Sequence, residues 1–338
     1  MTVAELTEVL GSRARALATV RWLWSRPQWS PLPAALPDVQ AKAWERLRAA
    51  CELPEFSIVE QSRSTDGTTK LAVQFGQASV ETVLIPAAGR STVCVSSQAG
   101  CTRNCSFCAT ATLGFNRNLG AGEIVAQYWH ARRMASPAAP ARNVVFMGMG
   151  EPMDNLDAVL RAIEVLTQSP APQLAASHIT VSTSGVLPGM VRFLKESRAS
   201  LALSVNASHD AQRAELMPQT KRWPLKALMD ELRRDRLENP RRIHFLEYVM
   251  FDGVNDTAED ATRLLALLDG VAARINLIAH NSFAGNPLRP SSDDAISAFQ
   301  RRVIAGGFAC FVRGSRGRDV DAACGQLALR AAPRKAFL

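Results

Sequence analysis

The sequence lacks the features of a secreted or membrane-embedded protein. The first residues, M-T-V-A-E-L-T-E-V-L, contain no basic start followed by an apolar run, and no stretch is long enough to span a bilayer. Seven cysteines occur in 338 residues, and four of them lie between positions 94 and 108, which does not suit a secreted disulfide framework. We therefore expect a cytoplasmic protein without a membrane partner.

Two further absences concern metal binding. No histidine lies between Cys94 and Cys108, and no second C-x2-C pair exists, whereas structural zinc sites usually combine closely spaced pairs of ligands. What is present is the run C-T-R-N-C-S-F-C, in which Cys101, Cys105 and Cys108 form a C-x3-C-x2-C cluster. A zinc knot completed by Cys94 or by a distant histidine remains the alternative to the interpretation that follows.

Three cysteines can hold a cube-shaped [4Fe–4S] cluster and leave one iron with an open position. A small molecule with an amine and a carboxylate can chelate that iron, and S-adenosylmethionine carries both groups. Electron transfer into the bound sulfonium would release a 5′-deoxyadenosyl radical, which abstracts hydrogen from unactivated carbon. The cysteine spacing is that of the radical SAM superfamily.

The charge of the chain favours a polyanionic partner. The formal net charge is +8, and many arginines occur in adjacent pairs or in the run from Arg313 to Arg318. Fixed cations attract and orient phosphate groups, so this balance supports binding to nucleic acid. Solvated helix faces are the plain alternative for many of these arginines.

Residues 1 to about 85 differ in pattern from the rest of the chain. Apolar residues at helical spacing predict helices on both sides of a proline-rich break at 26–37. Short alternating segments near 70–75 and 81–85, after the turn signal Asp66-Gly67, predict strands. We place an accessory domain at residues 1–88.

From about residue 92, short β-rich runs alternate with amphipathic helical stretches, which is typical of parallel β/α units. The expected strands cover residues 93–96, 143–148, 178–183, 201–205, 242–250, 274–278 and 308–313. The predicted fold class is α/β: a partial or complete (β/α) barrel at residues 89–338, with a small, mostly helical accessory domain before it.

Glycine or polar residues stand where several of these strands should end. They are Gly148, Gly150, Glu151, Ser182, Ser184, Ser204, Asn206 and Asn281. In α/β barrels the chemistry lies at the carboxyl ends of the strands, and the three-cysteine loop follows the first of them. Ordinary turn chemistry explains each residue singly, but their repetition at successive strands favours a bound ligand.

Strings along nearly the whole chain match one family. They are C-V-S-S-Q-A-G-C-T-R-N-C-S-F-C-A-T, G-F-N-R-N-L, M-G-M-G-E-P, S-T-S-G-V, E-Y-V-M, I-N-L-I and D-V-D-A-A-C-G-Q-L, with D-G-T-T-K and E-T-V-L-I-P before the barrel. In combination they resemble the radical SAM RNA methyltransferases, in particular the ribosomal RNA adenine C2 methyltransferases.

The resemblance implies roles for individual residues. Three cysteines, Cys101, Cys105 and Cys108, would ligate a [4Fe–4S] cluster. The S-adenosylmethionine site would comprise Gly150, Glu151, Ser182, Ser204, Val205, Asn206 and Asn281, with Gly150 and Glu151 at the ammonium end. Cys324 would be the methylated cysteine, Cys94 the second reactive cysteine and Glu81 the general base. Residues 1–88 would contact RNA, and the barrel would end in the reactive-cysteine segment.

The chemistry of adenine explains why two extra cysteines are useful. C2 lies between two ring nitrogens and is too electron-poor to attack a methyl sulfonium. If Cys324 first takes a methyl group by displacement, the radical can remove hydrogen from that group, and the resulting carbon radical can add to the ring. Release of the tethered RNA then needs a base for the ring proton and attack by Cys94 on the Cys324 sulfur, which forms a disulfide. Two S-adenosylmethionines are used per methyl transferred.

The expected substrate is an adenine of 23S ribosomal RNA, with transfer RNA as a second candidate. We expect a monomer that receives electrons from a donor such as a flavodoxin-type protein. Methylation at C8 of adenine would use the same cysteines and stays open as the nearest alternative activity. A non-catalytic RNA-binding iron–sulfur protein is the alternative from another class, and the presence of every reactive cysteine argues against it.

Two segments depart from the family pattern. The fourth strand ends in S-V-N-A where S-L-H-A is usual, and Ala279, His280 and Ser282 surround Asn281 where tryptophan and prolines are more usual. Asn206 can hydrogen-bond a ribose hydroxyl but carries no charge. Because both departures lie at the ligand-bearing rim, we expect an altered cofactor pose or RNA target, as in a divergent paralogue.

Overall fold

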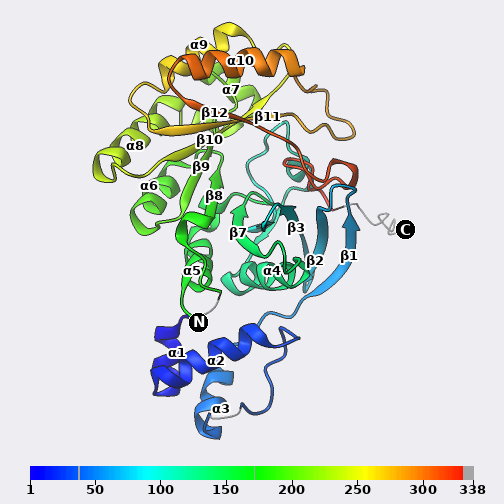
Figure 1. Cartoon of the computed structure of the whole chain (residues 1–338), viewed down its shortest axis with the longest axis vertical. Coiled ribbons are helices and arrows are strands. Elements are labelled where there is room, and N and C mark those ends of the chain that lie inside the picture. Colours follow the sequence, from blue (N-terminus) through cyan, green and yellow to red (C-terminus); the bar gives the residue numbers. More distant parts are fainter. Residues whose placement is uncertain (37–38, 171, 330–338) are drawn as a thin grey trace.

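A computed structural model describes residues 1–36, 39–170 and 172–329 (Figure 1). Its centre is a ten-stranded sheet in the order β1-β2-β3-β4-β7-β8-β9-β10-β11-β12. The strands are β1 (Ser57–Arg63), β2 (Thr69–Phe75), β3 (Ala78–Ala87), β4 (Arg90–Cys94), β7 (Ala141–Phe146), β8 (Ile179–Thr183), β9 (Ser200–Ser204), β10 (His244–Met250), β11 (Ala273–Ala279) and β12 (Ala309–Arg313). In the described part of the chain β1 and β12 do not pair, so the sheet is an open, partial barrel.

The seven strands from β4 to β12 run parallel, whereas β1 to β4 are antiparallel to one another. Each of the seven strands expected from the sequence overlaps one of the parallel strands, so the predicted α/β class is confirmed. Parallel neighbours need crossover connections, which helices supply here. These helices are α4 (Ala121–Met134), α5 (Leu156–Thr167), α6 (Leu187–Glu196), α7 (Asp210–Leu216), α8 (Leu225–Glu238), α9 (Ala258–Leu267) and α10 (Asp293–Ala305).

Helical periodicity explains how the crossover helices attach to the sheet. In α5, Val159, Ile163 and Leu166 recur at intervals of three to four residues and are buried. They join the apolar core that also contains the strand residues Val144, Val181 and Leu201. The helices therefore cover the outer side of the sheet, and its inner side remains for the site. Among the described residues, no helix combines the length and apolar character needed to cross a membrane.

A separate small core holds the N-terminal helices together. Helices α1 (Val3–Leu10), α2 (Arg13–Ser25) and α3 (Ala41–Ala50) bury Leu6, Leu10, Val20, Trp44 and Leu47 against one another. Figure 1 shows them as a lobe at the N-terminal end of the molecule. The helices expected before residue 51 are thus present.

The proposed division at residue 88 falls inside the main sheet. Strand β3 pairs with β4 on one side and with β2 on the other, and Leu71, Val73 and Val80 belong to the large core. Strand β1, which the sequence did not indicate, completes this antiparallel extension. Residues 57–87 therefore extend the barrel sheet, and the part of the chain with its own helical core ends near Cys51.

Two smaller features frame the site. Strands β5 (Gln98–Gly100) and β6 (Phe115–Asn118) form an antiparallel pair on either side of the three-cysteine loop. After β12, the chain returns to the β1–β2 edge, where Figure 1 shows the C-terminal segment beside these strands. Short 3-10 turns occur at η1 (Ala109–Leu113), η2 (Pro152–Asn155), η3 (Ala176–His178), η4 (Pro218–Lys221) and η5 (Arg318–Val320).

Candidate active site

The three-cysteine loop is closed at its base by the β5–β6 pair. The backbone N–H of Cys101 donates to the Gly114 carbonyl at 2.9 Å. A side chain at Gly100 would meet that same carbonyl oxygen at 1.9 Å, and the φ of Gly100 is +77°. Glycine is therefore required where the loop leaves β5. The tight base directs the loop toward the carboxyl ends of the parallel strands.

Cys101, Cys105 and Cys108 all line one cavity of about 170 Å³ at this rim. Burial raises the pKa of the Cys101 thiol to about 12 and that of Cys105 further still, and neighbouring thiols add to both shifts. A metal ligand must be a thiolate, so Cys101 and Cys105 need a bound cation to lose their protons. In the described part of the chain, no three His, Cys, Asp or Glu side chains enclose a point suited to a single metal ion. A [4Fe–4S] cluster fits the donor set, because three of its irons would each take one thiolate and the remaining iron would keep an open position.

The M-G-M-G-E-P turn follows β7 and lies against β5. A side chain at Gly150 would come within 2.5 Å of the Gln98 Cβ, and the φ of Gly150 is +98°. A side chain at Gly148 would come within 2.7 Å of the Ser96 hydroxyl oxygen. Both glycines allow the turn to approach the preceding segment closely, and Gln98 Oε1 accepts the Glu151 N–H at 2.8 Å. Gly148, Gly150 and Glu151 line the cavity.

Glu151 is a buried carboxylate that is held on several sides. Its Oε2 accepts from the Ser184 N–H at 2.8 Å and from the Ser184 hydroxyl at 2.6 Å, and its Oε1 accepts from the Met153 N–H at 3.1 Å. Burial raises the pKa of this carboxyl, and the hydrogen bonds from Ser184 and Met153 oppose the shift. A fixed, buried anion of this kind suits recognition of an ammonium group.

The strand-end residues expected to hold the cofactor are only partly brought together. Ser182, Ser204, Asn206 and Asn281 line the same cavity as the cysteines. Val205 is buried outside its lining: its N–H donates to the Glu247 carbonyl at 2.9 Å, and its own carbonyl accepts from Arg213. Any contact of Val205 with the cofactor would therefore have to come through a neighbouring residue.

Asn206 is held by the protein itself. Its φ is +57°, a conformation that asparagine tolerates, and its Oδ1 accepts from the Val249 N–H at 2.8 Å. Asn255 Nδ2 donates to the Asn206 carbonyl at 2.9 Å. The amide of Asn206 is thus oriented before any ligand binds, with Nδ2 directed at the Met217 sulfur at 3.4 Å.

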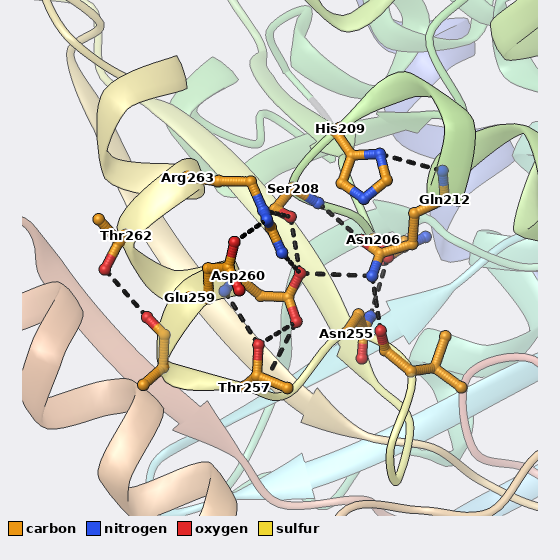
Figure 2. A network of polar contacts seen from close by, with 12 residues as sticks. Asn206, Ser208, His209, Gln212, Asn255, Thr257, Glu259, Asp260, Thr262 and Arg263 are labelled. Atoms are coloured by element: carbon orange, nitrogen blue, oxygen red, sulfur yellow. Dashed lines mark hydrogen bonds and ion pairs between the residues drawn. The ribbon is translucent and has the colours of Figure 1, made fainter.

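The network shown in Figure 2 fixes the segment that follows Asn206. Ser208 donates to Asp260 Oδ1 at 2.7 Å, and Thr257 donates to Oδ2 of the same carboxylate at 2.6 Å. Gln212 donates to the Asp260 carboxylate as well, at 3.3 Å. The Asp260 carboxylate, in the first turn of α9, therefore holds in place the segment after β9, where the sequence departs from the family pattern.

Cys324 lies in an irregular segment that several elements hold in place. The Gly325 carbonyl accepts from the Ala109 N–H at 2.7 Å, and the Cys324 carbonyl accepts from Asn281 Nδ2 at 3.1 Å. Thr110 donates to the Leu327 carbonyl at 2.6 Å. These bonds place Cys324 in the wall of the cavity that contains the three cluster cysteines.

The two reactive thiols have different surroundings. Cys324 is exposed to the cavity, and the surrounding protein raises its pKa to about 11, with a contribution from the Glu247 carboxyl and an opposing one from Arg313. Cys94 is buried at the end of β4 and does not line the cavity. Burial raises the pKa of Cys94 strongly, and the nearby Cys324 thiol adds to the shift.

Glu81 also lies outside the cavity lining, on β3. Its Oε1 is 2.9 Å from Lys70 Nζ, and its Oε2 is buried with no hydrogen-bond partner among the described residues. An unpaired oxygen of a buried carboxylate is costly. The Oε2 atom of Glu81 is therefore open to a further hydrogen-bond donor.

Sequence reasoning assigned no role to three further residues at the site, and it named only one of them, His280, as a departure from the family pattern. Arg213 is fully buried and donates to the carbonyls of Ser184 and Ser204 at 2.6 and 2.8 Å, and burial lowers its pKa to about 10. Glu247 lines the cavity and accepts from Asn276 at 2.8 Å, and burial raises its pKa. His280 lines the cavity, and its buried Nε2 has no hydrogen-bond partner among the residues that the structure describes. A signal existed for Glu247, a carboxylate inside the mostly apolar strand β10.

The fold and the site define a radical SAM protein. The Radical SAM superfamily model matches residues 95–265. A crystal structure of a radical SAM methyltransferase from Sphaerobacter thermophilus is 38% identical, covers 97% of each chain and superposes with a TM-score of 0.87.

Proteins with similar sequences show which group of radical SAM proteins this chain belongs to. A probable RNA methyltransferase of Sorangium cellulosum is 44% identical over 97% of this chain and 85% of its own length. The dual-specificity RNA methyltransferase RlmN 2 of Myxococcus xanthus is 40% identical over 96% of this chain and 87% of its own. The chain belongs to the radical SAM RNA methyltransferases of the RlmN type, which confirms the predicted family. Membership implies a [4Fe–4S] cluster, S-adenosylmethionine and an RNA substrate.

Proposed function

We propose that this enzyme methylates C2 of an adenine in 23S ribosomal RNA, with transfer RNA as a second substrate, and that the methyl group passes through Cys324. One observation supports the proposal above the others. Cys324 is exposed in the same cavity as Cys101, Cys105 and Cys108, and its thiol lies near enough to the buried Cys94 thiol to contribute to the raised pKa of Cys94. This is the arrangement that a methyl-carrying thiol and a resolving thiol need.

The residues of the rim fit the groups that the family uses. Cys101, Cys105 and Cys108 would hold the cluster, and Glu151 would bind the ammonium group of S-adenosylmethionine. When bound, the cluster and S-adenosylmethionine would supply the methyl group, the radical that abstracts hydrogen and the one-electron steps. Two S-adenosylmethionines would be used for each methyl group transferred. We assign the remaining contacts of S-adenosylmethionine to Ser182, Ser204, Asn206 and Asn281, with Val205 behind them.

Cys324 receives the methyl group on its sulfur. Because the cavity exposes this thiol, its sulfur is open to a displacement, and Asn281 holds its backbone carbonyl at 3.1 Å. The carbon on the Cys324 sulfur then bonds to C2 of the adenine, so that the RNA is tethered to the protein. Glu81, with its free oxygen, takes the C2 proton, and the one surplus electron of the ring leaves to the electron acceptor that the cluster would supply.

Cys94 releases the RNA. Its thiol attacks the Cys324 sulfur, a sulfur–sulfur bond forms and the sulfur–carbon bond breaks. The electron pair of the broken bond goes to the departing carbon, which takes a proton and becomes the methyl group. Cys94 and Cys324 are both free thiols in this structure, as they must be before the reaction starts.

The surroundings of the reaction complete the proposal. The helical lobe exposes Arg13, Arg21, Arg46 and Arg48, which supports an RNA-contacting role for the segment before the barrel. The enzyme works in the cytoplasm as a monomer and receives electrons from a flavodoxin-type donor.

Anaerobic reconstitution with iron and sulfide, followed by S-adenosylmethionine, a reductant and RNA, tests the proposal. Nuclease digestion and chromatography against both methyladenosine standards should yield 2-methyladenosine. The 8-methyl isomer would move the assignment to the alternative activity. If the protein retains RNA but forms neither a methylated nucleoside nor deoxyadenosine, the result would favour a non-catalytic RNA-binding protein.

A further inference from the structure

A buried lysine links the proposed base to the Cys324 segment. Nζ of Lys70 lies 2.9 Å from Oε1 of Glu81, and the two side chains are only 5% and 2% exposed. The same Nζ donates to the backbone carbonyl of Asp321 at 3.2 Å. One ammonium group therefore contacts both the carboxylate and the chain three residues before Cys324.

The register of the sheet places these groups on one side. Ala72 pairs with Glu81, and Lys70 pairs with Val83. Val83 also pairs with Cys94 on the next strand. Paired residues share a face of the sheet, as do residues two apart along a strand. Lys70, Glu81 and Cys94 therefore face the same side.

The ion pair leaves one carboxylate oxygen of Glu81 available. Lys70 holds Oε1, and Oε2 has no hydrogen-bond partner among the described residues. Burying a carboxylate costs free energy unless a positive charge lies beside it, and the Lys70 ammonium group supplies that charge. With one oxygen fixed, the position of the other is set as well.

We propose that Lys70 is a positioning residue for the release of RNA: it aims the free oxygen of Glu81 and keeps the Cys324 segment at a fixed distance from it. The inference rests on the proposed function, in which Glu81 takes the C2 proton. In that step the carbon–hydrogen bond breaks, an oxygen–hydrogen bond forms on Glu81, the electron pair stays in the ring, and the one surplus electron of the adduct leaves to the electron acceptor that the cluster would supply. Lys70 itself gains and loses no proton.

Two Lys70 variants test this in the reconstituted enzyme. Lys70→Met removes the charge and the donors, whereas Lys70→Gln removes the charge and keeps a donor for the Asp321 carbonyl. Both variants should still carry a methyl group on Cys324, but their protein–RNA adduct should decay at least about tenfold more slowly than in the wild type, as expected when a base is misplaced. In Lys70→Met, Cys324 should also react several-fold faster with iodoacetamide, measured on its peptide by mass spectrometry.

The matched control breaks a buried ion pair elsewhere. Arg242 lies 3.0 Å from Asp235, whose side chain is 2% exposed, and neither residue lines the cavity. Arg242→Met should lower the melting temperature and leave adduct decay and Cys324 alkylation at wild-type values. Lys70→Arg, which keeps the charge, should restore most of the decay rate.

Adduct decay at the wild-type rate in both the Met and the Gln variants would overturn the inference. Where the Met variant is unstable, the Gln variant decides by its decay rate alone. If the wild-type enzyme itself forms neither methyl-Cys324 nor an adduct, the proposed function has failed. The alkylation rate of Cys324 in Lys70→Met then shows separately whether Lys70 holds the segment.

Discussion

The regions around Cys94 and Cys324 are built in opposite ways. Cys94 ends β4, between β3 and β7, and both flanking strands pair with it through the backbone. Up to residue 329, where the described part of the chain ends, the Cys324 segment has no strand pairing, and side chains of other elements, such as Asn281 and Thr110, hold its carbonyls. Moving Cys94 would disrupt the sheet, whereas moving Cys324 would break only a few hydrogen bonds. The comparison favours Cys324 as the thiol that carries RNA and Cys94 as the fixed thiol that resolves the adduct.

The largest expected effect comes from removing the carrier. Cys324→Ala should abolish methyl transfer to RNA, because the other three cysteines that line the cavity would be taken up as cluster ligands, and should leave the cluster absorbance unchanged. Nucleoside analysis of the RNA provides the measurement. Cys310→Ala is the control, since Cys310 is a buried core residue on β12. Methylated RNA from Cys324→Ala would show that Cys324 is not the thiol that carries the methyl group.

Removing the resolving thiol should stop the reaction one step later. In Cys94→Ala, the methyl group still reaches Cys324 and RNA is still attached, so a covalent protein–RNA adduct should accumulate on a denaturing gel. Turnover should fall by roughly a hundredfold or more, as for loss of a nucleophile. Normal turnover in this variant would show that the sulfur–sulfur step is not used.

A smaller effect should follow from loosening the Cys324 segment alone. Asp319 accepts from the Ser64 hydroxyl at 2.5 Å and from the Thr65 N–H at 3.1 Å, and it thereby ties the segment to the β1–β2 turn. Asp319→Ala should speed iodoacetamide labelling of Cys324 a few-fold and leave Cys94 unlabelled. The free energy of unfolding should fall by about 1 kcal/mol per lost bond.

Asp294→Ala, at an exposed position in α10, is the control for this prediction. Equal labelling of Cys94 and Cys324 in Asp319→Ala would mean that the two regions are not mechanically distinct. Labelling is followed on the separate peptides by mass spectrometry.

The smallest effect concerns the pH dependence of labelling. Although the Cys324 thiol faces the cavity, desolvation by the protein packed around it raises its pKa to about 11, so the thiolate is scarce near neutral pH. Its fraction should grow about tenfold per pH unit until the pH approaches that pKa. Cys94, whose pKa is raised further, should stay unlabelled over the same range. A plateau in Cys324 labelling near pH 8 would contradict the electrostatic part of the account.

Much of this arrangement could be predicted from the sequence, because it depends on local patterns. Alternating β-rich and amphipathic runs located the seven parallel strands, and the C-x3-C-x2-C spacing located the cluster loop. The close approach at Gly150 could not be anticipated in detail, although the glycine itself was singled out. Residues at strand ends were grouped correctly because parallel strands finish at one rim.

Contacts between distant segments could not be predicted in the same way. Nothing local indicates that β1–β3 join the barrel sheet, since an alternating pattern predicts a strand and not its partner. The contacts of Lys70 with Glu81 and with the Asp321 carbonyl depend on the chain returning past β2 after β12. Arg213 was missed because a buried arginine without a paired carboxylate leaves no sequence signature.

The mass of the Cys324 peptide tests the central claim most directly. Reconstituted enzyme is incubated with S-adenosylmethionine in the absence of RNA, digested, and analysed for methylated cysteine. The account predicts that the peptide containing Cys324 is one methyl group heavier and that the peptide containing Cys94 is unchanged. A methyl group on Cys94, or none on Cys324, would contradict it.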